Sequence, residues 1–599
     1  MNTLLLFYKE EDLVITPTRQ PKPLSQVAEN ITVVTAEEIA MINAHTLADV
    51  LNHIPGVQMD IRGGPGSIAY AHIQGSEFSH VLVMVDGVTL NNLSDNSPDI
   101  SAIPVQYIER VEIIKGPGSS SWGSSLGGVI NVITKPTGNA PGSEGMLSGS
   151  YGERETRDLR AEFTGMNGRL GYYVHAGNLY TDGFTGNTNY DADNLYTKLR
   201  LDGWDGGGLT FTLGYNKGDR GMGEFGDLDM SFDHEFESLF STLSMDHAFS
   251  PRADAHLSVR TLRQDGDFIM DQISTGMELQ RNTAEDSVNG GTATITWRCG
   301  AHTAVVGADI DEGKLESLDI TGGEQTLRKW ALFANDTIAV NRFSLIPGIR
   351  YDHTNTNGDF VSPSIGMTFK ATERTLLRAY TARGFNTPSL SSTFGSGFFS
   401  LPNPDLDVEK VWSAQAGVET TELRCVWIKA TLFHHRVSDA LSKEDLLDPN
   451  GTPTGMIKMV NGERQRRQGV EVEVRTMPVY NISLLAGFSF VDATDRDTGE
   501  RLPDTPRYTY DVGIHYNNPR LFIAYLAGHY IWWHASPAND GKFDDFVWDL
   551  NLAKRVWGKG SAGLDAFLSV HNIFNASQYT LSYMKNPRRW AEAGVRFRF

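Results

Sequence analysis

The sequence predicts a membrane all-β fold, in which a 22-stranded antiparallel transmembrane β-barrel is occluded by an N-terminal mixed α/β plug domain. Three observations lead to this prediction. From about Met146 to Phe599, stretches of alternating apolar and polar residues recur. Short turns and longer polar segments separate these stretches in turn, as in an up-and-down barrel. The first 138 residues carry helical and buried-strand patterns instead.

The alternation assigns the two faces of each strand. In the stretch 195–202, the odd positions hold three leucines and a threonine, whereas the even positions hold Tyr196, a lysine, an arginine and an aspartate. Successive side chains of a strand point to opposite faces, so one face suits lipid and the other suits water. In 470–475, three valines alternate with two glutamates and an arginine. A soluble sandwich also alternates, but seldom combines so many charges on one face with so many aromatics on the other.

The short turns decide the size of the barrel. Ten short turns and eleven longer loops join 22 strands, if both barrel ends lie on the periplasmic side. Each strand with its connection then has about 21 residues, enough for a tilted span of about 10. A barrel this wide cannot be filled by its own side chains and needs a plug. We expect the short turns at 166–168, 204–208, 250–253, 299–302, 340–342, 371–374, 420–422, 477–480, 517–519 and 557–562.

Composition restricts the remaining classes. Hydrophobic residues make up 40% of the chain, and no apolar run approaches the roughly 18 residues of a membrane-spanning helix. The net charge of −21 argues against nucleic acid as a partner, because a phosphate-binding surface is basic. Only Cys299 and Cys425 are present, about six strands apart on the counted barrel, so we expect two unpaired thiols and no cysteine-rich metal site.

The first 138 residues predict a compact mixed α/β domain. Thr35 and Glu38 form a capping-box pattern ahead of one short helix, and Thr46 caps a second helix that ends at Pro55 and Gly56. Apolar strands follow at 81–85, 111–114 and 129–133. We therefore divide the chain into an N-terminal segment (1–20), a plug domain (21–138) and the barrel (139–599).

Eight sequence blocks resemble those of the TonB-dependent outer-membrane receptors. In the plug they are 54–57 (IPGV), 80–88 (HVLVMVDGV), 108–117 (IERVEIIKGP) and 122–135 (WGSSLGGVINVITK). In the barrel they are 383–390 (RGFNTPSL), 403–410 (NPDLDVEK), 469–474 (GVEVEV) and 572–579 (NIFNASQY). The resemblance covers essentially the whole chain. It implies a plugged barrel in a Gram-negative outer membrane that imports a scarce ligand.

One plug position departs from the family pattern. The family usually has Ile-Arg-Gly before the central plug strand, whereas this chain has Ile73-Gln74-Gly75. That arginine is thought to help lock the plug to the barrel. Gln74 can still donate hydrogen bonds, but the ionic contact at this position is in doubt.

The resemblance also implies an energy-coupling peptide. Asp12, Leu13, Val14, Ile15 and Thr16 resemble the TonB box, which binds TonB of the inner-membrane energy-coupling complex. An extended strand of this kind can add to a sheet edge of the partner. Pro17 interrupts the box early, because proline lacks a backbone donor. The alternative is an ordinary N-terminal strand.

The resemblance places the ligand between outward plug loops, roughly 62–70 and 89–97, and the extracellular barrel loops. Heme receptors of the family carry a histidine between the blocks that correspond to RGFNTPSL and NPDL here, and 391–402 has none. A ferric siderophore is the first candidate and cobalamin the second. The candidate substrate-binding residues are Arg62, Tyr70, Asn91, Asn92, Asp95, Phe394, Phe398 and Phe399, a set without a strong basic cluster.

Two acidic stretches raise the possibility of bound calcium. The stretch 219–237 holds seven carboxylates, and the preceding loop holds Asp182, Asp191 and Asp193. Calcium takes six to eight oxygen ligands, which extracellular loops of this kind can provide, although acidic loops are often simply solvated. The basic residues Lys458 and 464–467 either meet lipopolysaccharide phosphates or line the lumen. No other cofactor is expected.

No catalytic constellation is found, and His434 and His435 should point to opposite faces of a strand, so we predict no enzyme. The competing functions are a passive outer-membrane pore and a surface adhesion or docking protein. We expect a monomer in the outer membrane, in contact with lipid and lipopolysaccharide. Residues 1–8 do not form a convincing signal peptide, so we expect the export signal to have been removed or lost; a genuine cytoplasmic start is the alternative. The alternating C-terminal Val595, Phe597 and Phe599 resemble an outer-membrane assembly signal.

Overall fold

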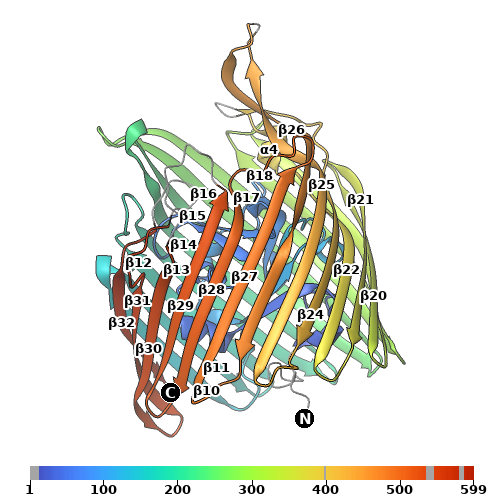
Figure 1. The fold of residues 1–599 in the computed structure, drawn as a ribbon, viewed down its shortest axis with the longest axis vertical. Helices are drawn as coiled ribbons and strands as arrows, with labels where there is room; N and C mark the ends of the chain where they lie inside the picture. Colours follow the sequence, from blue (N-terminus) through green and yellow to red (C-terminus); the bar gives the residue numbers. More distant parts are fainter. Residues whose placement is uncertain (1–12, 397–399, 449, 535–544, 579–585) are drawn as a thin grey trace.

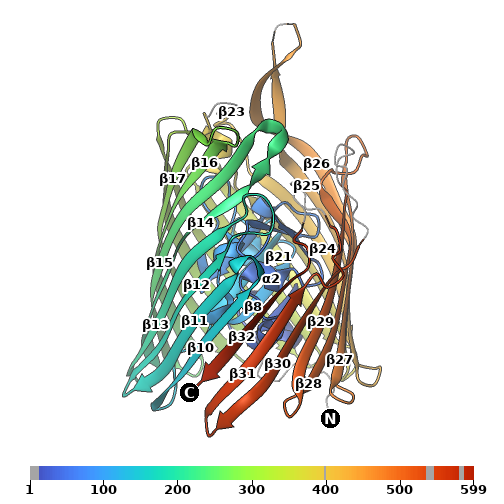
Figure 2. The ribbon, with the colours of Figure 1, turned by 90° about the vertical axis from the view of Figure 1, so that its left-hand side faces the viewer.

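The computed structural model describes residues 13–396, 400–448, 450–534, 545–578 and 586–599. It consists of a tall barrel with an internal domain that fills its lumen (Figures 1 and 2). The C-terminus lies at one end of the barrel (Figure 1).

The barrel is a closed sheet of 22 long antiparallel strands, as the sequence predicts. The first strand, β10, pairs with the last, β32, and closes the barrel. The short β23 (Ser400–Leu401) adds a parallel pairing to β26. The long strands are β10 (Gly142–Gly152), β11 (Arg157–Asn167), β12 (Leu170–Thr181), β13 (Tyr190–Trp204), β14 (Gly207–Phe225), β15 (Met230–Ser250), β16 (Ala253–Gln272), β17 (Met277–Cys299), β18 (His302–Ser317), β19 (Glu324–Val340), β20 (Phe343–Thr354), β21 (Gly358–Lys370), β22 (Thr375–Asn386), β24 (Glu409–Thr420), β25 (Val426–Leu447), β26 (Pro453–Thr476), β27 (Ile482–Asp495), β28 (Thr505–Asn518), β29 (Phe522–His534), β30 (Val547–Lys559), β31 (Ala562–His571) and β32 (Trp590–Arg598).

The ten short turns lie where the sequence predicts them, at the end of the barrel that holds the C-terminus. The first joins β11 to β12 after Asn167, and the last joins β30 to β31 after Lys559. At the opposite end several strands extend further, and the β25–β26 hairpin projects far beyond the rim (Figures 1 and 2). Cys299 and Cys425 are both unpaired, as expected.

The predicted strand faces are also correct. On β13, Leu195 and Leu201 are 38% and 45% exposed, whereas Tyr196 is fully buried against the internal domain. On β15, Leu239 is 39% exposed and its neighbour Phe240 is buried. The apolar face therefore points outward and the mixed polar and aromatic face points into the lumen.

The internal domain contains the predicted helices and strands. Its sheet has the order β3 (Asn30–Thr35), β8 (Ile108–Lys115), β9 (Gly128–Thr134), β6 (Val81–Val85) and β7 (Val88–Thr89). Thr35 and Glu38 form the predicted capping box of α1. Within the described residues, no helix is both long and apolar enough to cross a membrane. The remaining elements are β1 (Leu13–Val14), β2 (Lys22–Pro23), β4 (Val57–Ile61), β5 (Ala69–Ile73), α1 (Ala36–Ile42), α2 (Leu47–Leu51), α3 (Ser119–Trp122), the loop helix α4 (Leu390–Phe394) and the 3-10 turns η2 (Leu24–Gln26), η3 (Phe78–His80), η4 (Ile100–Ala102), η5 (Val105–Tyr107), η6 (Glu153–Glu155) and η7 (Gly226–Leu228).

The plug and the barrel share one hydrophobic core. The largest buried cluster joins plug residues such as Val83 and Ile113 to the barrel residues Tyr196, Phe240 and Leu262. The plug therefore seals the lumen by direct packing against the inner wall.

A buried histidine links the plug to both ends of the barrel sheet. His45 lies between α1 and α2; its Nδ1 is 2.6 Å from Asp158 of β11 and its Nε2 is 3.1 Å from Glu592 of β32. Burial lowers the pKa of His45, but the carboxylates of Glu592 and Asp158 more than offset this, so its pKa is raised well above the ordinary value. His45 is therefore a cation at neutral pH.

We predict that His45→Gln lowers the stability of the folded protein by about 1–3 kcal/mol, because it removes a charge-assisted contact to buried carboxylates. Because the folded pKa is raised, this contribution is complete below about pH 6.5 and is lost as the pH rises through the raised pKa. Thermal unfolding in detergent at several pH values measures it. His302→Gln, at an exposed histidine beside Asp336, is the control. Equal losses at all pH values would contradict the prediction.

Candidate functional site

A buried ionic cluster holds the plug against strand β26. Lys115 lies at the end of β8, and its Nζ is 3.1 Å from Glu473 Oε1 and 3.6 Å from Glu471 Oε2. Both glutamates face inward because they lie two residues apart on one strand. Burial lowers the pKa of Lys115, but Glu473 and Glu471 together raise it above the ordinary value. The lysine therefore stays charged inside the barrel.

The glutamine at the unusual plug position joins this cluster through hydrogen bonds. Gln74 Nε2 donates to Glu471 Oε1 at 3.1 Å, and Gln74 Oε1 lies 2.8 Å from His435 Nε2. Asn30 Nδ2 donates to the other oxygen of Glu471 at 2.6 Å. Gln74 thus donates as expected, and Lys115 supplies the charge that position 74 lacks.

The predicted coupling peptide is folded onto the plug. The backbone N–H groups of Ile15 and Thr16 both donate to Glu112 Oε2 at 2.9 Å, and Thr16 Oγ1 donates to the same oxygen at 2.6 Å. Leu13 is 41% exposed, whereas Val14 and Thr16 are buried. Asp12 lies outside the described residues. The main-chain donors at the end of the box are therefore occupied.

An arginine directly after the coupling peptide anchors it to the barrel wall. Arg19 Nη1 and Nη2 each lie 2.8 Å from a different oxygen of Asp309 on β18. Its guanidinium lies 4.1 Å from the ring centre of Trp122 and 4.2 Å from that of Phe333. Asp309 also accepts from Arg350 at 2.6 Å. Sequence reasoning missed this anchor, because no sequence pattern indicates that Arg19 and Asp309, 290 positions apart, lie together.

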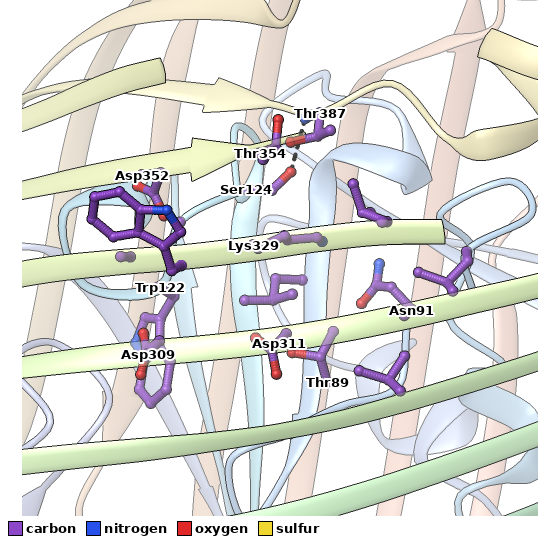
Figure 3. Close-up of a pocket in the computed structure, with 18 of the residues that line it drawn as sticks. Thr89, Asn91, Trp122, Ser124, Asp309, Asp311, Lys329, Asp352, Thr354 and Thr387 are labelled. Atoms are coloured by element: carbon purple, nitrogen blue, oxygen red, sulfur yellow. Dashed lines mark hydrogen bonds between the residues drawn. The ribbon is translucent and has the colours of Figure 1, made fainter. Parts of the chain in front are cut away.

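Two cavities flank the plug segment 88–97. The first, of about 120 Å³, is lined by Asn91 and Trp122 and by ionisable barrel residues that include Asp309, Asp311 and Lys329 (Figure 3). The second, of about 200 Å³, lies on the other side of the segment and is lined by more aromatic wall residues. Between Thr89 and Ser94, the odd positions line the first cavity and the even positions line the second.

The second cavity, here called the aromatic cavity, brings together three of the predicted substrate residues. Tyr70, Asn92 and Asp95 all line it. Arg62 lies beside them, with its guanidinium 4.8 Å from the ring centre of Tyr70 and its Nε 3.3 Å from Asp60. Burial raises the pKa of Tyr70 to about 12, so its hydroxyl stays protonated.

The other predicted substrate residues have different places. Asn91 accepts from Val83 N–H and donates to the carbonyls of Val81 and Asn96, so its amide is used by the plug fold. Phe394 packs beside a small core that contains Leu93 and Leu390, away from the aromatic cavity. Phe398 and Phe399 lie outside the described residues.

Sequence reasoning missed the barrel side of the aromatic cavity. Inward positions of three adjacent strands supply His234, Phe236 and Phe240 from β15, Gln264 and Phe268 from β16, and Asp286 from β17. Strand alternation marks these positions as inward, but it does not indicate which inward residues meet the plug loop.

The expectation of acidic loops at 219–237 is wrong. This stretch lies mostly on β14 and β15, which continue to Phe225 and restart at Met230. Alternate carboxylates share the outer face with Leu239, and Glu237 pairs there with Lys217 at 3.1 Å. In the described part of the chain, no group of three or more His, Cys, Asp or Glu side chains could hold a metal ion. Calcium binding stays a prediction.

The basic stretch near 464–467 divides between the two faces of β26. Arg467 is 2% exposed and faces the lumen, like Glu471 and Glu473 on the same strand. Arg464 is largely exposed and pairs with Asp497. The stretch therefore does not form one continuous basic surface.

Two family models match the chain. The model of the TonB-dependent receptor-like β-barrel matches residues 120–580, and that of the TonB-dependent receptor plug domain matches residues 23–129. The chain belongs to the TonB-dependent receptors. These are transporters and receptors, so the prediction of no enzyme is confirmed, and their fold is characteristic of the Gram-negative outer membrane.

Individual relatives agree with the family. The vitamin B12 transporter BtuB of Vibrio vulnificus (strain YJ016) is 23% identical over 483 residues, which cover 77% of this chain and 75% of that protein. The ferric enterobactin receptor PfeA of Pseudomonas aeruginosa has a similar fold, with a TM-score of 0.79, 17% identity, and 96% and 99% of the two chains covered. FpvA of P. aeruginosa, solved with heterologous pyoverdines, has a TM-score of 0.79 at 14% identity. The match covers 98% of this chain and 88% of the FpvA chain.

We predict that Lys115→Met loosens the plug, because it removes the buried cation that lies 3.1 Å from Glu473 and 3.6 Å from Glu471. Removing one partner of a buried ion pair costs about 3–5 kcal/mol. Ion conductance through planar bilayers and thermal unfolding in detergent report the change. The double variant Lys115→Met with Glu473→Gln should recover part of the loss. A tight, stable single variant would show that packing alone seats the plug.

We predict that Asp309→Asn frees the segment around Arg19, because it removes the charged partner of the guanidinium. Trypsin should then cleave the Arg19–Gln20 bond at least about tenfold faster, since a charge-assisted hydrogen bond is worth roughly 1.5–3 kcal/mol. Mass spectrometry of timed digests measures the rate. Asp311→Asn, on the same face of β18 and paired with Arg260, is the matched control. Equal rates in the two variants would rule out the anchor.

Proposed function

We propose that this receptor imports a scarce metal chelate across the outer membrane, with energy supplied through TonB. A ferric siderophore is the first candidate for the cargo and cobalamin the second. The observation that carries the proposal is the contact between the coupling peptide and the plug, at Thr16 and Glu112. A plug that seals the lumen must be moved before a chelate can pass. The coupling peptide is the segment through which TonB can apply force to the plug from the periplasmic side.

The occupied donors of the coupling peptide restrict how TonB engages it. Addition of a strand needs free main-chain N–H and C=O groups. Leu13 is exposed, but the N–H groups of Ile15 and Thr16 bond to Glu112, which lies on the plug strand β8, between β3 and β9. Full engagement by TonB therefore breaks the Glu112 contacts. A pull on the peptide then acts next to the strand that ends at Lys115.

The named ligands of the relatives are consistent with a chelate as cargo. BtuB is named for vitamin B12 and PfeA for ferric enterobactin. A passive pore fits poorly, because the plug shares its core with the wall. An adhesin has no need of a coupling peptide. The barrel closes on itself through β10 and β32, which favours a monomer in contact with lipid and lipopolysaccharide.

We predict that Val14→Pro abolishes uptake while cell-surface binding remains. Proline removes a backbone donor and breaks strand pairing with TonB. Uptake of radiolabelled ferric siderophores and cyanocobalamin is compared with binding to intact cells. Leu13→Ala, which keeps the backbone donor, is the control and should retain uptake. Unchanged uptake in Val14→Pro would favour a passive pore, and binding without uptake in the unaltered receptor would favour an adhesin.

A further inference from the structure

The aromatic cavity contains buried acceptor atoms that no group in the described part of the chain satisfies. Asp286 is 4% exposed; its Oδ2 accepts from Leu93 N–H at 2.7 Å, while its Oδ1 has no hydrogen-bond partner. Gln264 donates its amide to the Leu90 carbonyl at 3.3 Å, and its Oε1 is also without a partner. Buried acceptors normally have hydrogen-bond partners. Two unpaired acceptor atoms on one cavity wall therefore indicate a ligand or water that donates to them.

The charged residues of the lining indicate which ligands the cavity can accept. The described residues that line it include no lysine or arginine. Asp99 of the lining pairs with the buried Arg220, whose Nη1 lies 3.2 Å from an Asp99 oxygen. Asp95 and Asp286 form no ion pair with a lysine or arginine in the described part of the chain, so the lining offers acceptors without a balancing cation. A polyanionic ligand would be repelled there.

The rest of the wall is apolar and aromatic. His234 stacks on Phe268, with ring centres 4.2 Å apart and planes 6° from parallel. Phe268 is 43% exposed and Asp95 is exposed, which places the mouth of the cavity between the plug loop and β16. At about 200 Å³ the cavity is smaller than the roughly 300–1,000 Å³ of sites that enclose a whole ligand. It therefore suits one edge of a larger chelate.

We propose that the aromatic cavity binds the N–H-bearing edge of a metal chelate with no net negative charge, with Asp286 and Gln264 as the acceptors. The inference rests on the proposed import function and narrows its cargo. Amide-rich uncharged chelates such as cobalamins and ammonium-bearing hydroxamate chelates such as ferrioxamine B meet these requirements. Ferric tris-catecholates, which carry several negative charges, do not.

The test is isothermal titration of the full-length receptor in detergent with cyanocobalamin, ferrioxamine B and ferric enterobactin. We expect at least one of the first two to bind and ferric enterobactin to bind at least about tenfold more weakly. Asp286→Asn should weaken binding of the preferred chelate by about tenfold or more, because the amide has one acceptor oxygen and the Leu93 N–H already uses an oxygen of residue 286. Glu285→Gln, the adjacent exposed position on the opposite face of β17, is the matched control and should leave binding unchanged.

Gln264→Leu provides a second variant that keeps Asp286 bound to Leu93, and it should also weaken binding. Tight binding of ferric enterobactin would overturn the inference, as would unchanged binding in both cavity variants. Failure of both cyanocobalamin and ferrioxamine B to bind would overturn it as well. None of these outcomes removes the import proposal, which the uptake assay with Val14→Pro tests separately.

Discussion

The width of the barrel is the constraint on which the rest of the structure depends. Twenty-two strands enclose a lumen that their own side chains cannot fill, so inward polar residues need partners from elsewhere. The plug supplies these partners, as Lys115 does for Glu473 and as His45 does for Glu592. These contacts are buried, and a buried charge without a partner is costly. The barrel wall and the plug are therefore incomplete without each other.

The periodic part of the fold could be predicted from the sequence. Alternation of period two identifies a strand and its faces at once, and all ten short turns follow from breaks in that alternation. The acidic stretch 219–237 shows where this reasoning fails. Carboxylates at 233, 235 and 237 suggest a polar loop, but they lie at every second residue of an extension of β15, on its outward face. Aromatic residues at 232, 234 and 236 alternate with them. The period-two signal is therefore present, but its polar face points outward, the reverse of a lipid-facing strand.

The candidate site was predictable only on the plug side. Tyr70, Asn92 and Asp95 follow from the family arrangement, since the plug loops are local in sequence. Asn91 differs from them, because its amide joins the plug segment to Val81 and Val83. Contacts between plug and wall join residues hundreds of positions apart, such as Gln74 with His435. Their pairing depends on how the plug is rotated inside the barrel, and no local pattern encodes that rotation.

The same plug segment connects the outer cavity with the anchor of the coupling peptide. One side of 88–97 lines the aromatic cavity. The other side lines the first cavity, here called the charged cavity, whose wall includes Asp309, the partner of Arg19 (Figure 3). Leu93 bonds to Asp286 at one cavity and contacts the other through its side chain. A chelate edge that engages Asp286 therefore acts one residue away from the wall of the charged cavity. Packed groups therefore connect Asp286, the proposed ligand contact, with the Arg19–Asp309 pair that anchors the coupling peptide. A contiguous connection of this kind is a route by which ligand binding can alter that anchor.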